Sequence, residues 1–232
     1  MLLPLLVSLG FWQLDRAKEK IQILSALEEV KRLPGIQWNA NTLESGRLVE
    51  ATGHFETQKY WLLDNRIHRG KVGFEIIMPF YTDGAVALVN RGWVEGDLSR
   101  RSLPDVITPT GELTIIGRVH VAMENALVAF QSSESWPKLI SRVHLEAMYS
   151  SLDQNNAVNV ADNIIRLQQD SRAALITDWP AVNVLPQKHT AYAVQWFAMA
   201  FALLTMYIIY SSNILTLAGF NKDKHSNKEE AE

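Results

Sequence analysis

Four side chains near the C-terminus have the types and the spacing of a ligand-binding site. His189, Tyr192, Gln195 and Trp196 follow one another within about two helical turns, and on a helix Gln195 lies beside the face that the other three share. A polar residue at the edge of a membrane span is a candidate functional residue. A neutral imidazole can ligate haem iron, and its neighbours can contact a porphyrin. The alternative is that Lys188 and His189 only anchor the helix among lipid headgroups.

A second candidate site is the run Asn90-Arg91-Gly92-Trp93, which ends a strand-like segment. Glycine permits a positive φ or a close backbone approach, and arginine offers a planar fork of donors for a carboxylate. Tryptophan adds a flat apolar face. Together these residues predict docking of an acidic apolar ligand or of a partner protein. The alternative is a bulge in a hairpin, with Arg91 in an internal ion pair.

Motifs of the common enzyme classes are absent from the sequence. It contains no G-x-S-x-G elbow, P-loop, H-E-x-x-H or G-x-G-x-x-G, and no cysteine that could serve as a nucleophile or metal ligand. No two of the six histidines are three or four residues apart, so a helix-borne metal pair is absent. Four of them are interpreted as surface or sheet-edge residues: His54, His68, His120 and His144. We therefore expect a protein that is not an enzyme.

The overall charge argues against nucleic-acid binding. The net charge of -3 provides no broad basic field. The length of 232 residues allows one domain of ordinary size with appendages, and seven tryptophans, several beside apolar runs, suit a membrane interface.

The C-terminal part of the chain predicts a membrane-spanning helix over 189–214. The most apolar portion, 191–209, approaches the ~20 residues that cross a bilayer, and aromatic residues lie near both of its ends. A buried core helix is the alternative, although a soluble helix of this length normally carries a polar stripe. The charged tail, 215–232, is predicted to be disordered and cytoplasmic.

The N-terminal part predicts a second membrane helix, assigned to 1–20. The apolar segment 1–14 would rise only ~21 Å, so we expect the first turns of this helix to lie outside the chain. Trp12 and Arg16 would then mark the membrane interface. A signal peptide is the alternative, but the segment lacks a basic n-region and an A-x-A-like cleavage site.

The region between the spans, 21–188, predicts a β-rich domain. A helix over Ala17–Leu33 continues the first span until Pro34-Gly35, and a short helix is expected late in the domain, over Leu139–Leu152. Segment 159–169 is ambiguous between strand and polar loop. Strand-like runs cover 47–55, 59–66, 73–81, 86–94 and 111–122, the last as one long strand or a pair, with Asp83-Gly84 as a turn. The predicted fold is thus an α+β membrane protein, with two transmembrane helices flanking a mainly antiparallel barrel- or sandwich-like sheet of six or more strands.

Four segments occur in an order that resembles the SURF1/Shy1 family of cytochrome c oxidase assembly proteins. They are "LGFWQLDRAKEK", "GFEIIMPF", "LVNRGWV" and "KHTAYAVQWFAMA". The resemblance implies a multi-pass protein of the bacterial inner membrane, with its middle domain in the periplasm. It also implies a role in the assembly of haem-copper oxidases. Bacterial members look like haem a carriers, and the histidine that opens their last helix matches His189; Lys188 and Ala191 depart from the usual Asn and Gly.

The resemblance leads to one expected function and one alternative. The expected function is to bind haem a, with His189 as iron ligand, and to present it to nascent oxidase subunit I among other assembly factors. Further haem contacts are expected from Tyr192, Gln195, Trp196, Trp12 and Arg16, with Arg16 or Arg91 meeting the propionates. The alternative is a cofactor-free scaffold that docks on oxidase intermediates through Asn90, Arg91, Gly92 and Trp93.

Overall fold

The computed structural model describes residues 2–42, 44–97, 102–121, 130–152 and 159–212. The chain divides into two compact units, one of Met1–Ser25 with Ala181–Glu232 and one of Ala26–Pro180. The predicted cytoplasmic tail, 215–232, and the last residues of the predicted C-terminal span lie outside the described residues. The domain limits predicted at 20/21 and 188/189 stay predictions.

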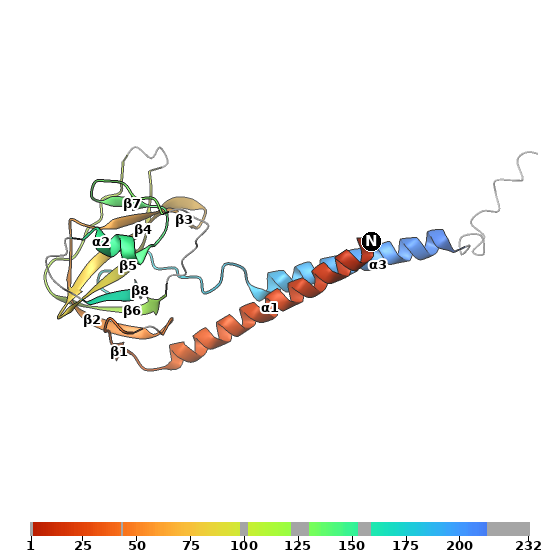
Figure 1. The fold of residues 1–232 in the computed structure, drawn as a ribbon, viewed down its shortest axis with the longest axis horizontal. Coiled ribbons are helices and arrows are strands. Elements are labelled where there is room, and N and C mark those ends of the chain that lie inside the picture. The colour runs from red at the N-terminus through yellow and green to blue at the C-terminus, as the bar shows by residue number, and fades with distance from the viewer. Residues whose placement is uncertain (1, 43, 98–101, 122–129, 153–158, 213–232) are drawn as a thin grey trace, which may run out of the picture. The chain divides into compact units, whose positions relative to one another are not determined.

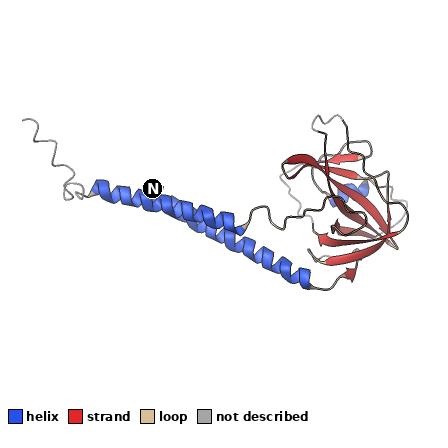
Figure 2. Cartoon of the chain, turned by 180° about the vertical axis from the view of Figure 1, so that it is seen from behind, coloured by secondary structure: helices blue, strands red, loops and turns tan. Residues whose placement is uncertain are grey.

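The first unit is built from two long helices that run antiparallel (Figures 1 and 2). Helix α1 covers Leu2–Arg32 without a break, which confirms that the predicted helix over 17–33 continues the N-terminal one. It ends just before Pro34, as predicted, because the residue before a proline is disfavoured in helical conformation. Helix α3 covers Pro186–Ser211. Within the described residues, α3 is the one helix whose length and composition suit a membrane span.

Small residues allow the two helices to approach closely. The buried residues of α3, Pro186, Ala193 and Ala200, recur every seven positions. A seven-residue repeat keeps one face of a helix turned toward its neighbour. On α1 the buried residues are Leu6, Gly10 and Ala17.

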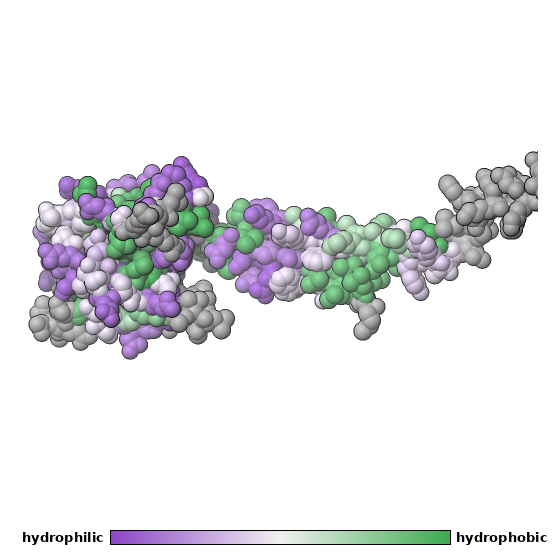
Figure 3. All heavy atoms as spheres, turned by 90° about the horizontal axis from the view of Figure 1, so that it is seen from above, coloured by the Kyte–Doolittle hydropathy of each residue, from purple (hydrophilic) through white to green (hydrophobic). Residues whose placement is uncertain are grey.

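Gly10 shows how tight this packing is. A Cβ added to Gly10 would lie 2.6 Å from the ring of Phe197, and the Phe11 and Phe197 rings meet edge to face with centroids 5.3 Å apart. Packing of small and aromatic side chains is a typical means of association for apolar helices. Figure 3 shows hydrophobic side chains (green) gathered on one stretch of the helices, while hydrophilic side chains (purple) dominate another stretch.

The second unit is an eight-stranded sheet that closes on itself. Its strand order is β1-β2-β6-β8-β5-β4-β3-β7, and an extra pairing of β2 with β4 joins His54 to Tyr81 and Phe55 to Phe80. Strands β2, β6, β8, β5 and β4 therefore form a ring (Figure 1). The strands are β1 Ile36–Gln37, β2 Leu48–Phe55, β3 Trp61–His68, β4 Lys71–Thr82, β5 Ala85–Glu95, β6 Leu113–His120, β7 Lys138–Ile140 and β8 Asn159–Leu167.

Apolar residues cover both faces of the central strands. Because side chains alternate across a strand, Ile76 and Met78 of β4 join the cluster that fills the ring, while Ile77 joins a second cluster outside it. The inner cluster draws residues from all five ring strands, among them Val49, Ala51, Phe80, Ala87, Val89, Ile115, Ile165 and Leu167. The outer cluster packs under helix α2, Leu145–Ser150, through Trp61, Leu88, Met148, Tyr149 and Ile164. The predicted barrel-like α+β fold is confirmed.

Several local expectations need correction. The helix expected over Leu139–Leu152 is only α2, capped at its start by His144, whose Nδ1 accepts from the Ala147 N–H at 3.2 Å. Lys138–Ile140 is strand β7, because parallel pairing with β3 outweighs the local helical pattern. The ambiguous segment 159–169 contains strand β8, and the described part of 111–122 forms a single strand, one of its two predicted forms.

The sheet is mainly antiparallel, as predicted. The pairs β1–β2, β3–β7 and β5–β8 are parallel, whereas the other pairs of the sheet are antiparallel. The hairpin predicted at Asp83-Gly84 is confirmed, since β4 and β5 pair up to Thr82 and Ala85 and Gly84 has a φ of 86°.

Candidate functional site

His189 contacts helix α1 through a single polar partner. Its Nδ1 lies 2.8 Å from Oε1 of Gln13. An amide oxygen only accepts hydrogen bonds, so Nδ1 carries the proton and donates it. The other ring nitrogen, Nε2, is then an unprotonated acceptor. It is buried and has no hydrogen-bond partner among the described residues.

Helical periodicity places both residues in the contact between α1 and α3. We call this contact the seam; its buried residues are Leu6, Gly10, Ala17, Pro186, Ala193 and Ala200. His189 lies three residues after the buried Pro186 and four before the buried Ala193, and Gln13 holds the same relation to Gly10 and Ala17. Residues at these spacings share one face of a helix. The small neighbours bring the helices close enough for two short polar side chains to meet. The seam therefore positions the imidazole and selects its tautomer.

The other residues predicted around His189 lie in different environments. Trp196, one heptad after His189, is half-buried, whereas Gln195 is exposed. Tyr192 and Trp12 keep about half of their surface, at 50% and 51% exposure. Arg16 is exposed and pairs with Glu19 of its own helix at 2.7 Å. The haem-binding roles assigned to these residues stay predictions.

Gln13 is the residue that the sequence analysis missed. It stands beside Trp12 in "GFWQLDR", where the aromatic and charged neighbours drew attention instead. A usable signal was present, because Gln13 is an uncharged polar residue inside the apolar face defined by Leu6, Gly10 and Ala17. The partner of His189 could have been found by aligning the seams of the two helices.

The second candidate site is a bulge in the β4–β5 hairpin. The register shifts between Ile76, opposite Gly92, and Ile77, opposite Asn90, so Arg91 is the extra residue. Gly92 has a φ of 123°, and an added Cβ would lie 2.6 Å from the carbonyl oxygen of Ile176. The predicted bulge is confirmed, and glycine is required there by both conformation and space.

Arg91 lies inside the barrel rather than in an ion pair. It is 2% exposed, and its guanidinium lies over the ring of Phe55 at 5.5 Å. Its Nε donates to the carbonyl of Ala173 at 2.8 Å, Nη1 to the hydroxyl of Thr108 at 2.8 Å and Nη2 to the carbonyl of Ile107 at 3.0 Å. No carboxylate pairs with it among the described residues. Burial lowers the pKa of Arg91 to about 10.

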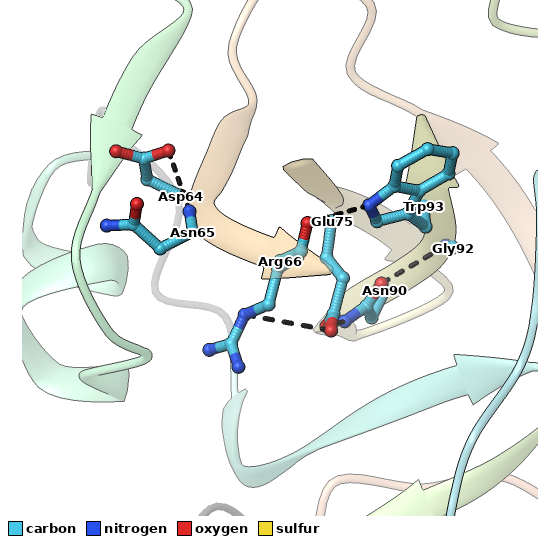
Figure 4. A network of polar contacts seen from close by, with 7 residues as sticks. All are labelled: Asp64, Asn65, Arg66, Glu75, Asn90, Gly92 and Trp93. Carbon is cyan, nitrogen blue, oxygen red and sulfur yellow. Dashed lines mark hydrogen bonds and ion pairs between the residues drawn. The ribbon is translucent and has the colours of Figure 1, made fainter. Parts of the chain in front are cut away.

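Asn90 and Trp93 complete a network of internal contacts, which Figure 4 shows. The Asn90 amide donates to Oε2 of Glu75 at 2.6 Å, and its oxygen accepts from the Gly92 N–H at 3.1 Å. The indole of Trp93 donates to the carbonyl of Arg66 at 3.0 Å. These contacts hold the strand end in place, and a docking role for the four residues stays a prediction.

The described residues contain no group of three or more His, Cys, Asp or Glu that could hold a metal ion. Three other described histidines, His54, His68 and His120, lie on the barrel unit. His54 stacks on Tyr81, and His68 lies 3.6 Å from Asp178. Burial and the charge of Arg166 lower the pKa of His120 to about 4.

Comparison with known proteins places this chain in a family. The model of the SURF1 family matches residues 1–201, which include α1, the barrel and most of α3. This chain belongs to the SURF1 family. A SURF1-like protein of Rickettsia felis is 26% identical over 229 residues, covering 92% of this chain and 95% of the relative. A SURF1-like protein of Rickettsia conorii is 28% identical over 223 residues, covering 89% of this chain and 86% of the relative.

Membership of the SURF1 family implies a role in cytochrome c oxidase assembly and association with a membrane. The single span-like helix α3 agrees with that association. The family is one of assembly factors rather than of known enzymes. The seam of α1 and α3 and the bulge of β5 both lie within the part of the chain that the family model matches.

Proposed function

We propose that this SURF1 family member binds haem a through Nε2 of His189 and presents it to oxidase subunit I. The observation that carries the proposal is the buried, unpaired Nε2 of an imidazole whose Nδ1 proton is already engaged by Gln13. A histidine that ligates a metal usually donates its second N–H to a fixed acceptor, which orients the ring and raises its basicity. The arrangement around His189 meets that requirement with an uncharged acceptor.

The side chains around the seam fit a porphyrin. Trp12, next to Gln13 in the chain, and Tyr192, one turn after His189, offer exposed aromatic surface. Trp196 and Gln195 follow on α3, and Arg16 is close enough along α1 to meet a propionate if it releases Glu19. When bound, haem a supplies the redox group that the oxidase requires. Because Nε2 is covered, the side chains over it must move aside as the ligand enters.

The same proposal includes a location. With α3 crossing the bilayer, His189 in its first turn lies at the membrane edge, where the ring of a haem can be shielded from water. We propose that α1 provides the second span in a bacterial inner membrane and that the barrel faces the periplasm. There it would meet subunit I and other oxidase assembly factors. The resemblance of the two membrane-boundary motifs, "LGFWQLDRAKEK" and "KHTAYAVQWFAMA", to the family supports this orientation.

A visible spectrum of the purified protein tests the haem a proposal. The full chain is expressed in cells that make haem a, purified in detergent and compared with His189→Ala and His54→Ala. We expect a Soret band in the wild type and in His54→Ala, because His54 is exposed and lies on the barrel. The band should be lost in His189→Ala, since no other nitrogen occupies its place on the seam. A colourless wild type that still co-purifies with subunit I would overturn haem binding and leave the cofactor-free scaffold.

A further inference from the structure

Arg166 of β8 is a charged side chain that has no hydrogen-bond or ion-pair partner among the described residues. Its Nε is fully buried and makes no hydrogen bond, and no ion pair joins Arg166 to any described residue. Its two terminal nitrogens make no hydrogen bond to a described residue and are not among the buried unpaired atoms, so they are accessible to solvent. The guanidinium lies over the indole of Trp179 at 5.0 Å, and that indole is fixed by donating to the carbonyl of Leu167 at 2.8 Å. A flat aromatic support of this kind holds a guanidinium in one plane.

The neighbours of Arg166 extend across the outer surface of the barrel. Ile165 and Leu167 point into the ring, so Arg166 between them points outward. Asn90 is its register partner on β5, and the Asn90 amide donates to Oε2 of Glu75 on β4. Arg66 of β3 lies on the other side of Glu75, with Nε 3.7 Å from Oε1. Strands β8, β5, β4 and β3 thus bring two arginines to one glutamate.

One carboxylate is shared by the two guanidinium groups of this cluster. Glu75 is the carboxylate between the two guanidinium groups, and its oxygens already face Asn90 and Arg66. Figure 4 shows the terminal nitrogens of Arg66 directed away from Glu75. Asp178, the residue before Trp179, lies near His68 instead. In the contacts described for Arg166 and Arg66, the two guanidinium groups therefore share the single carboxylate of Glu75.

Burial is the main influence on the charge state of Arg166. It lowers the pKa of Arg166, Glu75 raises it, and the nearby Arg66 lowers it. A charged group removed from water is strongly destabilising unless hydrogen bonds or an opposite charge compensate. The free donors of Arg166 and Arg66 are those that carboxylate and phosphate oxygens bind most strongly.

We propose that Arg166 and Arg66, supported by Trp179 and flanked by Glu75, form a binding site for an oxyanion of the carboxylate or phosphate type. The site lies wholly within the barrel unit and does not depend on haem. The oxyanion can belong to a free anion or to an acidic side chain of a partner protein.

Arg118 provides a matched control. It lies directly opposite Arg166 in the β6–β8 pair, on the same face of the sheet. Its Nη1 donates to the carbonyl of Gly46 at 2.8 Å, so its guanidinium is turned to an internal acceptor. Arg118 is thus an arginine on the same face of the sheet as Arg166, but its guanidinium already donates a hydrogen bond within the protein.

The test is a titration of the full-length protein in detergent, observed through the arginine Nε–H signals in nitrogen-15 NMR. Inorganic phosphate and a hexaglutamate peptide are added separately, at constant ionic strength maintained with chloride. We expect saturable shifts of the Arg166 and Arg66 signals and none for Arg118. Saturation should be abolished in Arg166→Gln and retained in Arg118→Gln. Tighter binding of phosphate would identify a free anion, and tighter binding of the peptide would identify an acidic segment of a partner.

Two results would overturn the proposal. One is an Arg166 signal that does not move, or moves linearly, with both probes in the wild-type protein. The other is equal saturation in Arg166→Gln and wild type. If Arg166→Gln does not fold, Arg166→Lys keeps the charge without the planar fork and should weaken binding about tenfold. Whether or not these variants fold, the titration of the wild-type protein shows whether Arg166 binds either probe.

Discussion

The helix seam and the barrel interior each hold a polar side chain among apolar neighbours, but the two side chains differ in how completely they are hydrogen-bonded. In the barrel, every nitrogen of Arg91 donates to a fixed acceptor, and the arginine joins three chain segments. On the seam, His189 has one nitrogen bonded and the other buried without a partner. A filled set of donors stabilises a fold, whereas an unfilled acceptor has a cost that a ligand can remove. The difference separates a structural residue from a candidate ligand-binding one.

The largest expected effect is a loss of stability on replacing Arg91 in the barrel interior. Arg91→Ala leaves the carbonyls of Ala173 and Ile107 and the hydroxyl of Thr108 without their donor, and it opens a cavity. We expect a loss of about 3–5 kcal/mol in the free energy of unfolding, or a protein that does not fold. Thermal unfolding followed by circular dichroism measures this loss of stability. Arg172→Ala is the control, because Arg172 is exposed. If Arg91→Ala melts with the control but fails to support oxidase assembly, the arginine is a docking or ligand residue after all.

A smaller loss is expected at the bulge. Gly92→Ala places a Cβ 2.6 Å from the carbonyl oxygen of Ile176, at a φ of 123°. The free energy of unfolding should fall by about 2–3 kcal/mol. Gly84→Ala is the matched comparison, because Gly84 also has a positive φ, 86°, but an added Cβ there meets nothing within 4 Å. Equal melting temperatures for the two variants would show that strand β5 does not need the close approach to Ile176.

The smallest effect on stability, and the most specific, is expected on the seam. Gln13→Leu removes the acceptor of the His189 N–H and leaves the volume nearly unchanged, so the helices should stay paired. We expect haem a affinity to fall about 10- to 100-fold, because the ring loses its orientation and its tautomer. Gln13→Glu keeps an acceptor and should retain binding. Absorbance titration with haem a checks both variants, and unchanged affinity in Gln13→Leu would show that Gln13 does not position the imidazole.

The sequence analysis succeeded where a local pattern and the tertiary structure demand the same conformation. The continuous helix to Arg32, the turn at Asp83-Gly84 and the bulge at Gly92 all have local causes, namely a following proline or a glycine with positive φ. It failed where pairing overrode the local pattern. Leu139 and Ile140 carry helical spacing but form strand β7, because β3 offers them unpaired backbone partners.

The sequence by itself determined the family and the barrel-like α+β fold, and it made His189 the leading candidate ligand. Four motifs in order and the strand spacing suffice for these conclusions, because each depends on neighbours along the chain. Only the tertiary structure decided that Gln13 meets His189, that Arg91 is bonded to carbonyls rather than to a carboxylate, and that Arg166 has no bonded partner among the described residues. The physical reason is that hydrogen-bond partners are set by which helix faces and strand registers come together. Residues 13 and 189 meet only because small side chains let two distant helices touch.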